Sequence, residues 1–81
     1  MSRAARDRNQ DHLLGPLGEA VRKARADRGV SQEKLANMTG IERSHMGRIE
    51  RGEANISFLN LMKIAQALNA ELSAILKSAG Y

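Results

Sequence analysis

The stretch from residue 31 to residue 52, SQEKLANMTGIERSHMGRIERG, constrains the fold more than any other part of the chain. Ser31 is a favourable N-cap, because its hydroxyl can accept a hydrogen bond from a free amide of the following turn. Gly40 suits the left-handed conformation that ends many helices. A second helix is then expected over residues 42–51, where Gly52 stops it. The pattern predicts two short helices joined by a tight turn.

The second of these helices has a cationic face and an apolar face. Met46 and Ile49 lie on one side, where they can anchor the helix to a core. Gly47 lies on the other side, costs about 1 kcal/mol of helix propensity, and leaves a bare backbone that another surface can approach closely. At about 100° per residue, the cationic arc of roughly 140° carries, in angular order, Arg43, Gly47, Arg51, Ser44 and Arg48.

The position of this arginine face in the chain decides how it is interpreted. A charge run on an amphipathic helix is ordinarily a solvated face. Here the helix follows a glycine turn and a capped partner helix, which together form the unit that places a recognition helix in the major groove of DNA. The sequence therefore favours a helix that reads DNA over one that is merely solvated.

Motifs on both sides of this unit resemble the helix-turn-helix of the phage repressor/Cro (XRE-type) family, including small stand-alone members such as restriction–modification controller proteins. They extend over residues 17–76, which is nearly everything outside the N-terminal segment. The resemblance implies an all-α, compact five-helix bundle of the lambda-repressor-like type. The matching pieces are Ala24-Arg25, Gly29-Val30-Ser31-Gln32, Leu35-Ala36, Gly40-Ile41, Ile49-Glu50-Arg51-Gly52, Leu61, Ile64-Ala65 and Ala67-Leu68.

Composition narrows the class of partner. Eighty-one residues allow one domain with a modest core. The chain has no cysteine, which excludes a disulfide framework and a zinc finger, and no metal or other cofactor is expected. Its net charge of +4 favours nucleic acid before membrane. Since polar residues interrupt every long apolar stretch, no membrane span or secretory signal is expected, and a cytoplasmic location, on the nucleoid when DNA is bound, follows by default.

The chain divides into three parts by its apolar pattern. Residues 1–13 are basic and lack a helical apolar stripe, so we expect either a frayed terminus or a flexible arm that touches phosphates or a minor groove. Residues 14–77 form the DNA-binding domain, and residues 78–81 are a tail. Gly15-Pro16 is expected to open the first long helix, since proline suits the first helical position.

Two further helices are expected after the loop at residues 53–56. Ser57 is the N-cap of the fourth helix, and residues 70–77 form the fifth. The core face of the fourth helix is predicted to carry Phe58, Leu61, Ile64, Ala65 and Leu68. Other apolar residues lack an evident place in a monomer and are candidates for a two-fold dimer seam, the alternative being scattered surface apolarity. These candidates are Leu59, Met62, Ile75 and Leu76.

The resemblance also implies roles for individual residues. Arg25 is expected to form a structural ion pair with Glu50 and so tie the first helix to the recognition helix. Base edges are expected to be read by Arg43, Ser44 and Arg48, and arginine can donate two hydrogen bonds to guanine O6 and N7. Contacts to the DNA backbone are expected from Gln32, Lys34, His45, Arg51 and Asn55.

The expected function is that of a sequence-specific regulator of transcription that binds double-stranded DNA at a palindromic operator as a homodimer. Half-site centres should then lie about 34–36 Å apart. No small-molecule effector is expected. The alternative from another class is a protein-interaction module, an antitoxin or bridging protein, that keeps the fold without reading bases. An enzyme is the least favoured option, because no nucleophile–base pair or carboxylate cluster is present.

Overall fold

Five α-helices make up the part of the chain that the computed structural model describes, and this part contains no strand. The model describes the backbone of residues 3–81 and the side chains of residues 12–81. The expected all-α, five-helix architecture is confirmed. The helices are α1 (Arg3–Asp27), α2 (Gln32–Thr39), α3 (Arg43–Glu50), α4 (Phe58–Ala67) and α5 (Leu72–Ser78).

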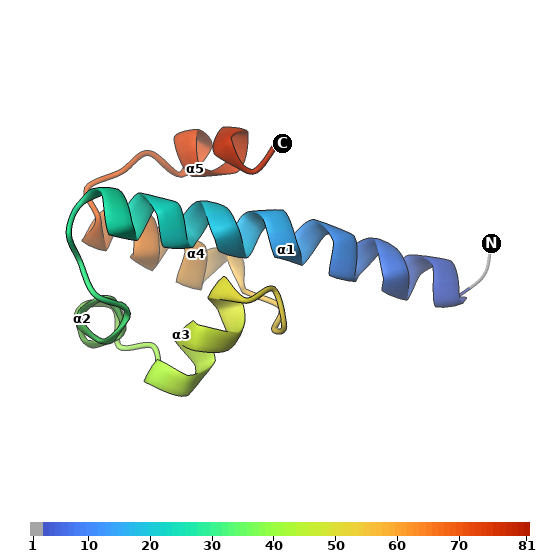
Figure 1. Ribbon diagram of the computed structural model, residues 1–81, viewed down its shortest axis with the longest axis horizontal. Helices are drawn as coiled ribbons and strands as arrows, with labels where there is room; N and C mark the ends of the chain where they lie inside the picture. Colours follow the sequence, from blue (N-terminus) through green and yellow to red (C-terminus); the bar gives the residue numbers. More distant parts are fainter. Residues whose placement is uncertain (1–2) are drawn as a thin grey trace.

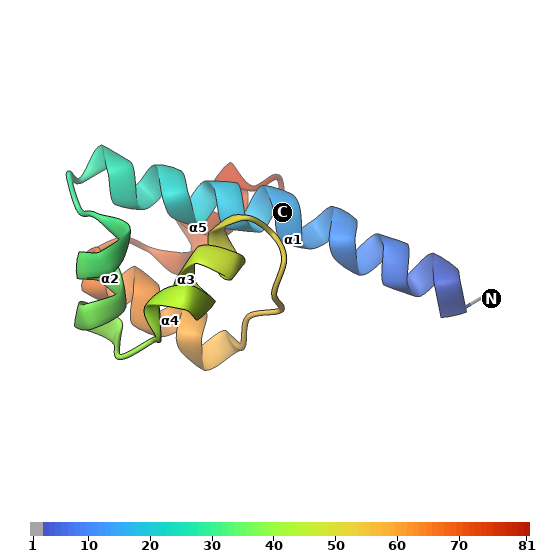
Figure 2. The ribbon, with the colours of Figure 1, turned by 60° about the horizontal axis from the view of Figure 1, so that its bottom comes forward.

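The long helix α1 organises the arrangement, with the other four helices packed around its C-terminal half (Figure 1). It contacts α2, α3 and α5, while α2 also packs on α3 and α4, and α4 packs on α5. The N-terminal turns of α1 project beyond this bundle, as both views show (Figures 1 and 2). Figure 2 shows α2 and α3 as neighbours joined by a short turn.

The predicted start of the first helix at Gly15-Pro16 is wrong, because Pro16 lies inside α1. Proline removes the hydrogen bond to the carbonyl four residues before it and its ring crowds that carbonyl. The helix nevertheless continues through it, since residues 3–14 include Ala, Arg, Gln and Leu, which favour helix. The Tyr81 hydroxyl also donates a hydrogen bond to the carbonyl of Leu13, which ties the C-terminus to the turn before the proline. The basic segment 1–13 was expected to contact DNA. Almost all of its side chains lie outside the described ones, so this expectation stays a prediction.

The predicted helix caps are confirmed. The Ser31 hydroxyl accepts a hydrogen bond at 3.0 Å from the backbone N–H three residues on, and the Ser57 hydroxyl does the same at 3.1 Å. Such caps contribute about 1 kcal/mol each. Gly40 ends α2 with φ +75°, a conformation in which a side chain would be strained. Each of these signals acts within one turn of the chain and marks a helix end, two of them at the ends of α2 and one at the start of α4.

One core joins all five helices. The expected apolar back of α3 is buried, with Met46 at 0% and Ile49 at 2% exposure. Val21 of α1, Leu35 of α2 and Ile64 of α4 are likewise fully buried. Around them lie Leu17, Ala20, Ala36, Ile41, Ala54, Leu61, Ala65, Leu68 and Ile75.

Two residues differ from their predicted burial. Phe58 was expected in the core but is 70% exposed. It lies on the same stripe as Leu61, yet it is the first residue of α4, and no other helix of the described part of the chain covers that end. Ile75 was expected in a dimer seam but is only 3% exposed, so the prediction is wrong for this residue. The reason is that α5 packs on α1 and directs Ile75 into the core of the same chain.

A glycine of α1 allows this helix to approach the C-terminal end of α3. A Cβ atom on Gly18 would lie 2.3 Å from the carbonyl oxygen of Ile49 and 2.7 Å from that of Glu50. Both contacts are to backbone, which cannot rotate away as the end of a side chain can. Because Gly18 has no side chain, α1 and α3 meet backbone to backbone, and α3 is held close to the centre of the bundle.

We expect Gly18→Ala to lower the free energy of unfolding by about 1–3 kcal/mol, because the added methyl forces α1 and α3 apart. Gly15→Ala is the matched control in the same helix, since a Cβ there would meet nothing within 4 Å. It should change the free energy of unfolding by less than about 1 kcal/mol, because the helix propensity that alanine adds is offset by crowding between its Cβ and the ring of Pro16. Urea unfolding of both variants measures the difference, and a Gly18→Ala variant as stable as Gly15→Ala would contradict the close approach.

Candidate nucleic-acid interface

The solvent side of α3 carries the three side chains predicted to read bases. Arg43, Ser44 and Arg48 are all exposed, while the opposite side of the helix is buried in the core. Neither Arg43 nor Arg48 forms an ion pair within the part of the chain described here. The structure therefore presents two unneutralised guanidinium groups on a helix whose other side is fully packed.

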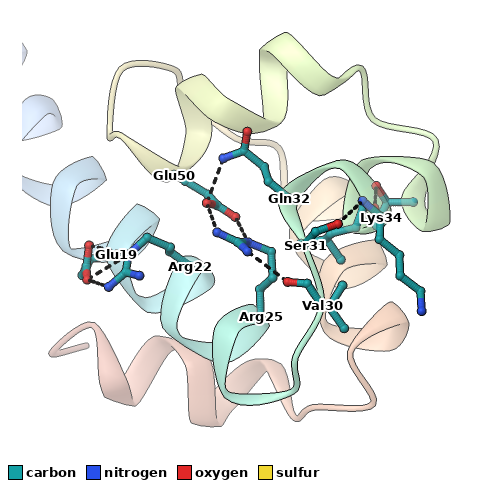
Figure 3. A network of polar contacts seen from close by, with 10 residues as sticks. Glu19, Arg22, Arg25, Val30, Ser31, Gln32, Lys34 and Glu50 are labelled. Carbon is teal, nitrogen blue, oxygen red and sulfur yellow. Dashed lines mark hydrogen bonds and ion pairs between the residues drawn. The ribbon is translucent and has the colours of Figure 1, made fainter.

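A buried ion pair holds α3 against α1. Arg25 donates from Nε to Glu50 Oε2 at 2.7 Å and from Nη2 to Glu50 Oε1 at 2.9 Å, which is a two-pronged arrangement (Figure 3). Its remaining Nη1 donates to the carbonyl of Val30 at 2.9 Å. The side chain of Glu50 is 3% exposed and that of Arg25 is 15% exposed. The pair is thus shielded from water. Charge-assisted hydrogen bonds are stronger in such a low-dielectric environment than in solvent.

Gln32 extends this ion pair to α2. Its Nε2 donates to Glu50 Oε1 at 3.0 Å, so the Glu50 carboxylate joins side chains from α1 and α2 to the last residue of α3 (Figure 3). No buried side-chain nitrogen or oxygen of the described residues is left without a partner. We call Arg25, Gln32 and Glu50 the three-helix clamp.

Gly47 has a different role from the one its place on the helix wheel suggested. It is buried, and a Cβ there would lie 3.0 Å from Arg51 Nη1 and 3.3 Å from Gln32 Oε1. The surface that approaches this bare backbone is therefore the chain's own Gln32 and Arg51. The missing side chain leaves room for Gln32 to reach Glu50.

The other residues predicted to contact a DNA backbone surround α3. Lys34, Arg51 and Asn55 are exposed, and His45 is half-buried. Arg51 forms an ion pair with Glu53 at 3.1 Å, but both side chains are more than half exposed, so the pair is weak.

The amide of Asn55 remains able to donate to a partner. Its Oδ1 accepts a hydrogen bond from the backbone N–H of Ile56 at 3.0 Å, which uses the acceptor of the side chain and leaves the NH₂ group. Asn55 therefore faces solvent as a donor, which is the chemistry that a phosphate oxygen accepts.

Two shallow open hollows lie on either side of α3. Ser44 and Arg48 line both, so these two residues form the ridge between them. The first hollow is completed by Gln32, Arg43, Gly47 and Arg51, and is cationic. The second is completed by Gly40, Ile41, Glu42, His45 and Asn60, and contains a carboxylate. The two sides of α3 therefore differ in charge.

The remaining charged pairs lie away from this surface. On α1, the Arg22 guanidinium forms an exposed ion pair with Glu19, and its hydrogen bonds lower the pKa of that carboxyl. Among the residues the structure describes, no three His, Cys, Asp or Glu side chains gather as a metal site would require. Nor does any helix within them have the length and apolar character needed to cross a membrane.

The candidate seam residues are placed unevenly. Leu59 is 63% exposed, and Met62 and Leu76 are half-buried, whereas Ile75 belongs to the core as described above. Phe58 adjoins Leu59 at the start of α4 and adds to the exposed apolar surface there.

Two residues that position or flank the site had not been singled out from the sequence. Gly18 adjoins Leu17 beside the predicted apolar stripe of α1, and a glycine next to the core positions of a helix is the signal of a close approach. Glu42 directly precedes α3 and lines one of the two hollows. The only feature of the sequence that points to Glu42 is that an acidic residue lies beside a cationic helix.

Comparison with known proteins places this geometry in a family. A family model described as Helix-turn-helix, HTH_3, matches residues 21–75. The control protein C.SmaI of Serratia marcescens is 38% identical over 64 residues, which cover 79% of this chain and 76% of that protein. The control protein C.BamHI of Bacillus amyloliquefaciens is 39% identical over 56 residues, which cover 68% and 69%.

A solved structure has the same arrangement of helices. The restriction–modification controller protein C.AhdI from Aeromonas hydrophila superposes with a TM-score of 0.74 at 39% identity, over 79% of this chain and 96% of that one. The resemblance of the sequence to XRE-type regulators is therefore confirmed.

We expect Glu50→Ala to lower the free energy of unfolding by about 3 kcal/mol, because it leaves the partly buried Arg25 guanidinium without its counter-charge. Asp27→Ala is the control, since it breaks an ion pair with Lys23 whose side chains are 63% and 59% exposed, and it should change stability by less than about 1 kcal/mol. Urea unfolding measures both changes in the free energy of unfolding, provided that the dependence of this free energy on urea concentration is the same in all variants. Equal effects of the two substitutions would contradict the importance of the clamp.

Proposed function

The chain belongs to the helix-turn-helix family HTH_3 and is a DNA-binding transcriptional regulator, and from this membership we propose that it acts as a homodimer with α3 of each copy in the major groove. The observation that carries the proposal is that Arg43 and Arg48 are exposed and have no ion-pair partner among the described side chains, on a helix that the three-helix clamp holds in place. Fixing the helix in advance reduces the entropy lost when these side chains meet DNA. Such a protein would act on the nucleoid.

Arg43, Ser44 and Arg48 are the proposed base readers. An arginine can donate two hydrogen bonds to guanine O6 and N7, which discriminates against other bases by about 1–3 kcal/mol. Two arginines on one reading surface therefore suit a half-site that contains guanines. Support comes from their exposure on one side of α3, around the ridge that Ser44 and Arg48 form between the two hollows.

Phosphate contacts are proposed for residues around the ends of α2 and α3. Arg51 can exchange its weak ion pair with Glu53 for a phosphate, and the free amide of Asn55 can donate to another. The N-terminus of α2 presents unpaired amides, which attract anions. Lys34 and His45 are the remaining proposed contacts, and Gln32 is proposed to touch the DNA backbone in addition to its place in the clamp.

The proposed dimer joins two copies through the exposed apolar surface of α4 and α5. Leu59, Met62 and Leu76 are the candidate seam residues, to which the exposure of Phe58 adds a fourth. A domain over residues 14–77 reads half a site, so two copies related by a two-fold axis would read a palindromic operator. Its half-site centres would lie about 34–36 Å apart.

We expect the affinity for duplex DNA to fall steeply as salt rises from 50 to about 200 mM, since bound phosphates release counterions. Arg48→Ala should reduce the preference for selected over random duplexes, because it removes a base contact. Arg51→Ala should weaken all duplexes alike and lower the salt slope by about one. Mobility-shift titrations of the three proteins measure these effects.

Two outcomes would contradict the proposed DNA binding or the residues assigned to it. Binding that does not depend on salt, or no binding at all, would favour a module that contacts protein in place of bases. Unchanged preference in Arg48→Ala together with an unchanged salt slope in Arg51→Ala would show that these residues are wrongly assigned.

We expect the double substitution Leu59→Asp, Met62→Asp to convert a dimer into a monomer, because four carboxylates would face one another across the seam. Met38→Asp is the control, since Met38 is 48% exposed on α2 and lies outside the proposed seam. Sedimentation equilibrium gives the mass of each protein. A double variant with the mass of the wild type would contradict the seam.

A further inference from the structure

Glu42 occupies the N-cap position of α3 but does not act as a cap. Its side chain makes no hydrogen bond to the free amides of the first turn, although this is the usual task of a polar residue at that position. Its Oε1 accepts a hydrogen bond from the Ser44 hydroxyl at 2.7 Å instead. The carboxylate is exposed and is held beside the reading side chains of α3.

This hydrogen bond determines whether Ser44 can donate or only accept a hydrogen bond from a partner. A hydroxyl has one proton, and Ser44 gives it to Glu42, so only the lone pairs of its oxygen remain. An ionised carboxylate likewise accepts and does not donate. Glu42 and Ser44 together therefore present hydrogen-bond acceptors only, and they repel phosphate.

The arginines supply the opposite chemistry. Arg43 and Arg48 are donors only, and Arg48 lines the same hollow as Glu42. The major-groove edge of a C·G pair has a matching arrangement, since cytosine N4 donates while guanine O6 and N7 accept. An adenine also donates, through N6, but its N7 acceptor lies next to that amino group and repels a carboxylate.

We propose that the Glu42 carboxylate accepts a hydrogen bond from the N4 amino group of a cytosine and so determines one base pair of the operator. Arg48 donates to the guanine of that pair or of its neighbour, and Ser44 orients the carboxylate. This inference rests on the proposed function, because it requires α3 to lie in the major groove.

The test is selection of duplexes from a random pool with the wild type, Glu42→Gln and Glu71→Gln. Glu71 is a matched control, since it is also an exposed N-cap residue without a capping hydrogen bond, but it precedes α5, which packs on α1 and α4. Both variants remove one negative charge. Circular dichroism and thermal unfolding check that each variant keeps the fold.

We expect the wild type to select a cytosine at one position and Glu42→Gln to lose about tenfold of that preference, equivalent to about 1.4 kcal/mol. Adenine should gain there, because glutamine pairs with adenine N6 and N7. Glu71→Gln should select the wild-type sequence. Replacing the selected cytosine by N4-methylcytosine should weaken wild-type binding by a similar factor, since the methyl displaces the donated proton.

The inference is overturned if Glu42→Gln keeps the same cytosine preference, or if N4-methylcytosine leaves wild-type binding unchanged. Those results would leave the proposed function standing, because the wild type would still bind selected DNA in a salt-dependent way. A wild-type protein that binds no duplex would instead refute the proposed function itself.

Discussion

The placement of α3 depends on the hydrogen bonds that the Glu50 carboxylate accepts. This carboxylate belongs to the last residue of α3, and it accepts hydrogen bonds from Arg25 of α1 and Gln32 of α2. A buried carboxylate is costly unless it is paired and fully hydrogen-bonded. Because its partners come from two other helices, the carboxylate is satisfied only when all three helices hold their native positions.

Two residues without side chains make this interaction possible. Gly18 lets α1 touch the backbone of Ile49 and Glu50, and Gly47 leaves the space that Gln32 crosses to reach the carboxylate. The clamp therefore uses the back and the C-terminal end of α3 and leaves its solvent side free. This division of the helix separates stability from recognition. The clamp residues are buried or half-buried, while the exposed Arg43 and Arg48 form no ion pair among the described residues and can take partners from outside.

Local signals predicted most of the fold, and they failed where distant parts of the chain decide. The caps at Ser31, Gly40 and Ser57 each act within one turn, so a few neighbouring letters were enough to identify them. Phe58 and Ile75 were misplaced because periodicity gives the apolar face of a helix but not what covers it. Helix α5 lies on α1 and buries Ile75, whereas Phe58 and Leu59 in the first turn of α4 stay exposed among the residues that the structure describes.

The sequence by itself determined the helix–turn–helix unit, the cationic face of its second helix and the family to which the chain belongs. Those properties follow from residue types at fixed short spacings. Only the tertiary structure decided that Glu50 is shared by two partners, that Gly47 is covered by the chain itself and that Glu42 is bound to Ser44. These contacts depend on which rotamers and helix crossings pack together, and a linear pattern does not specify either.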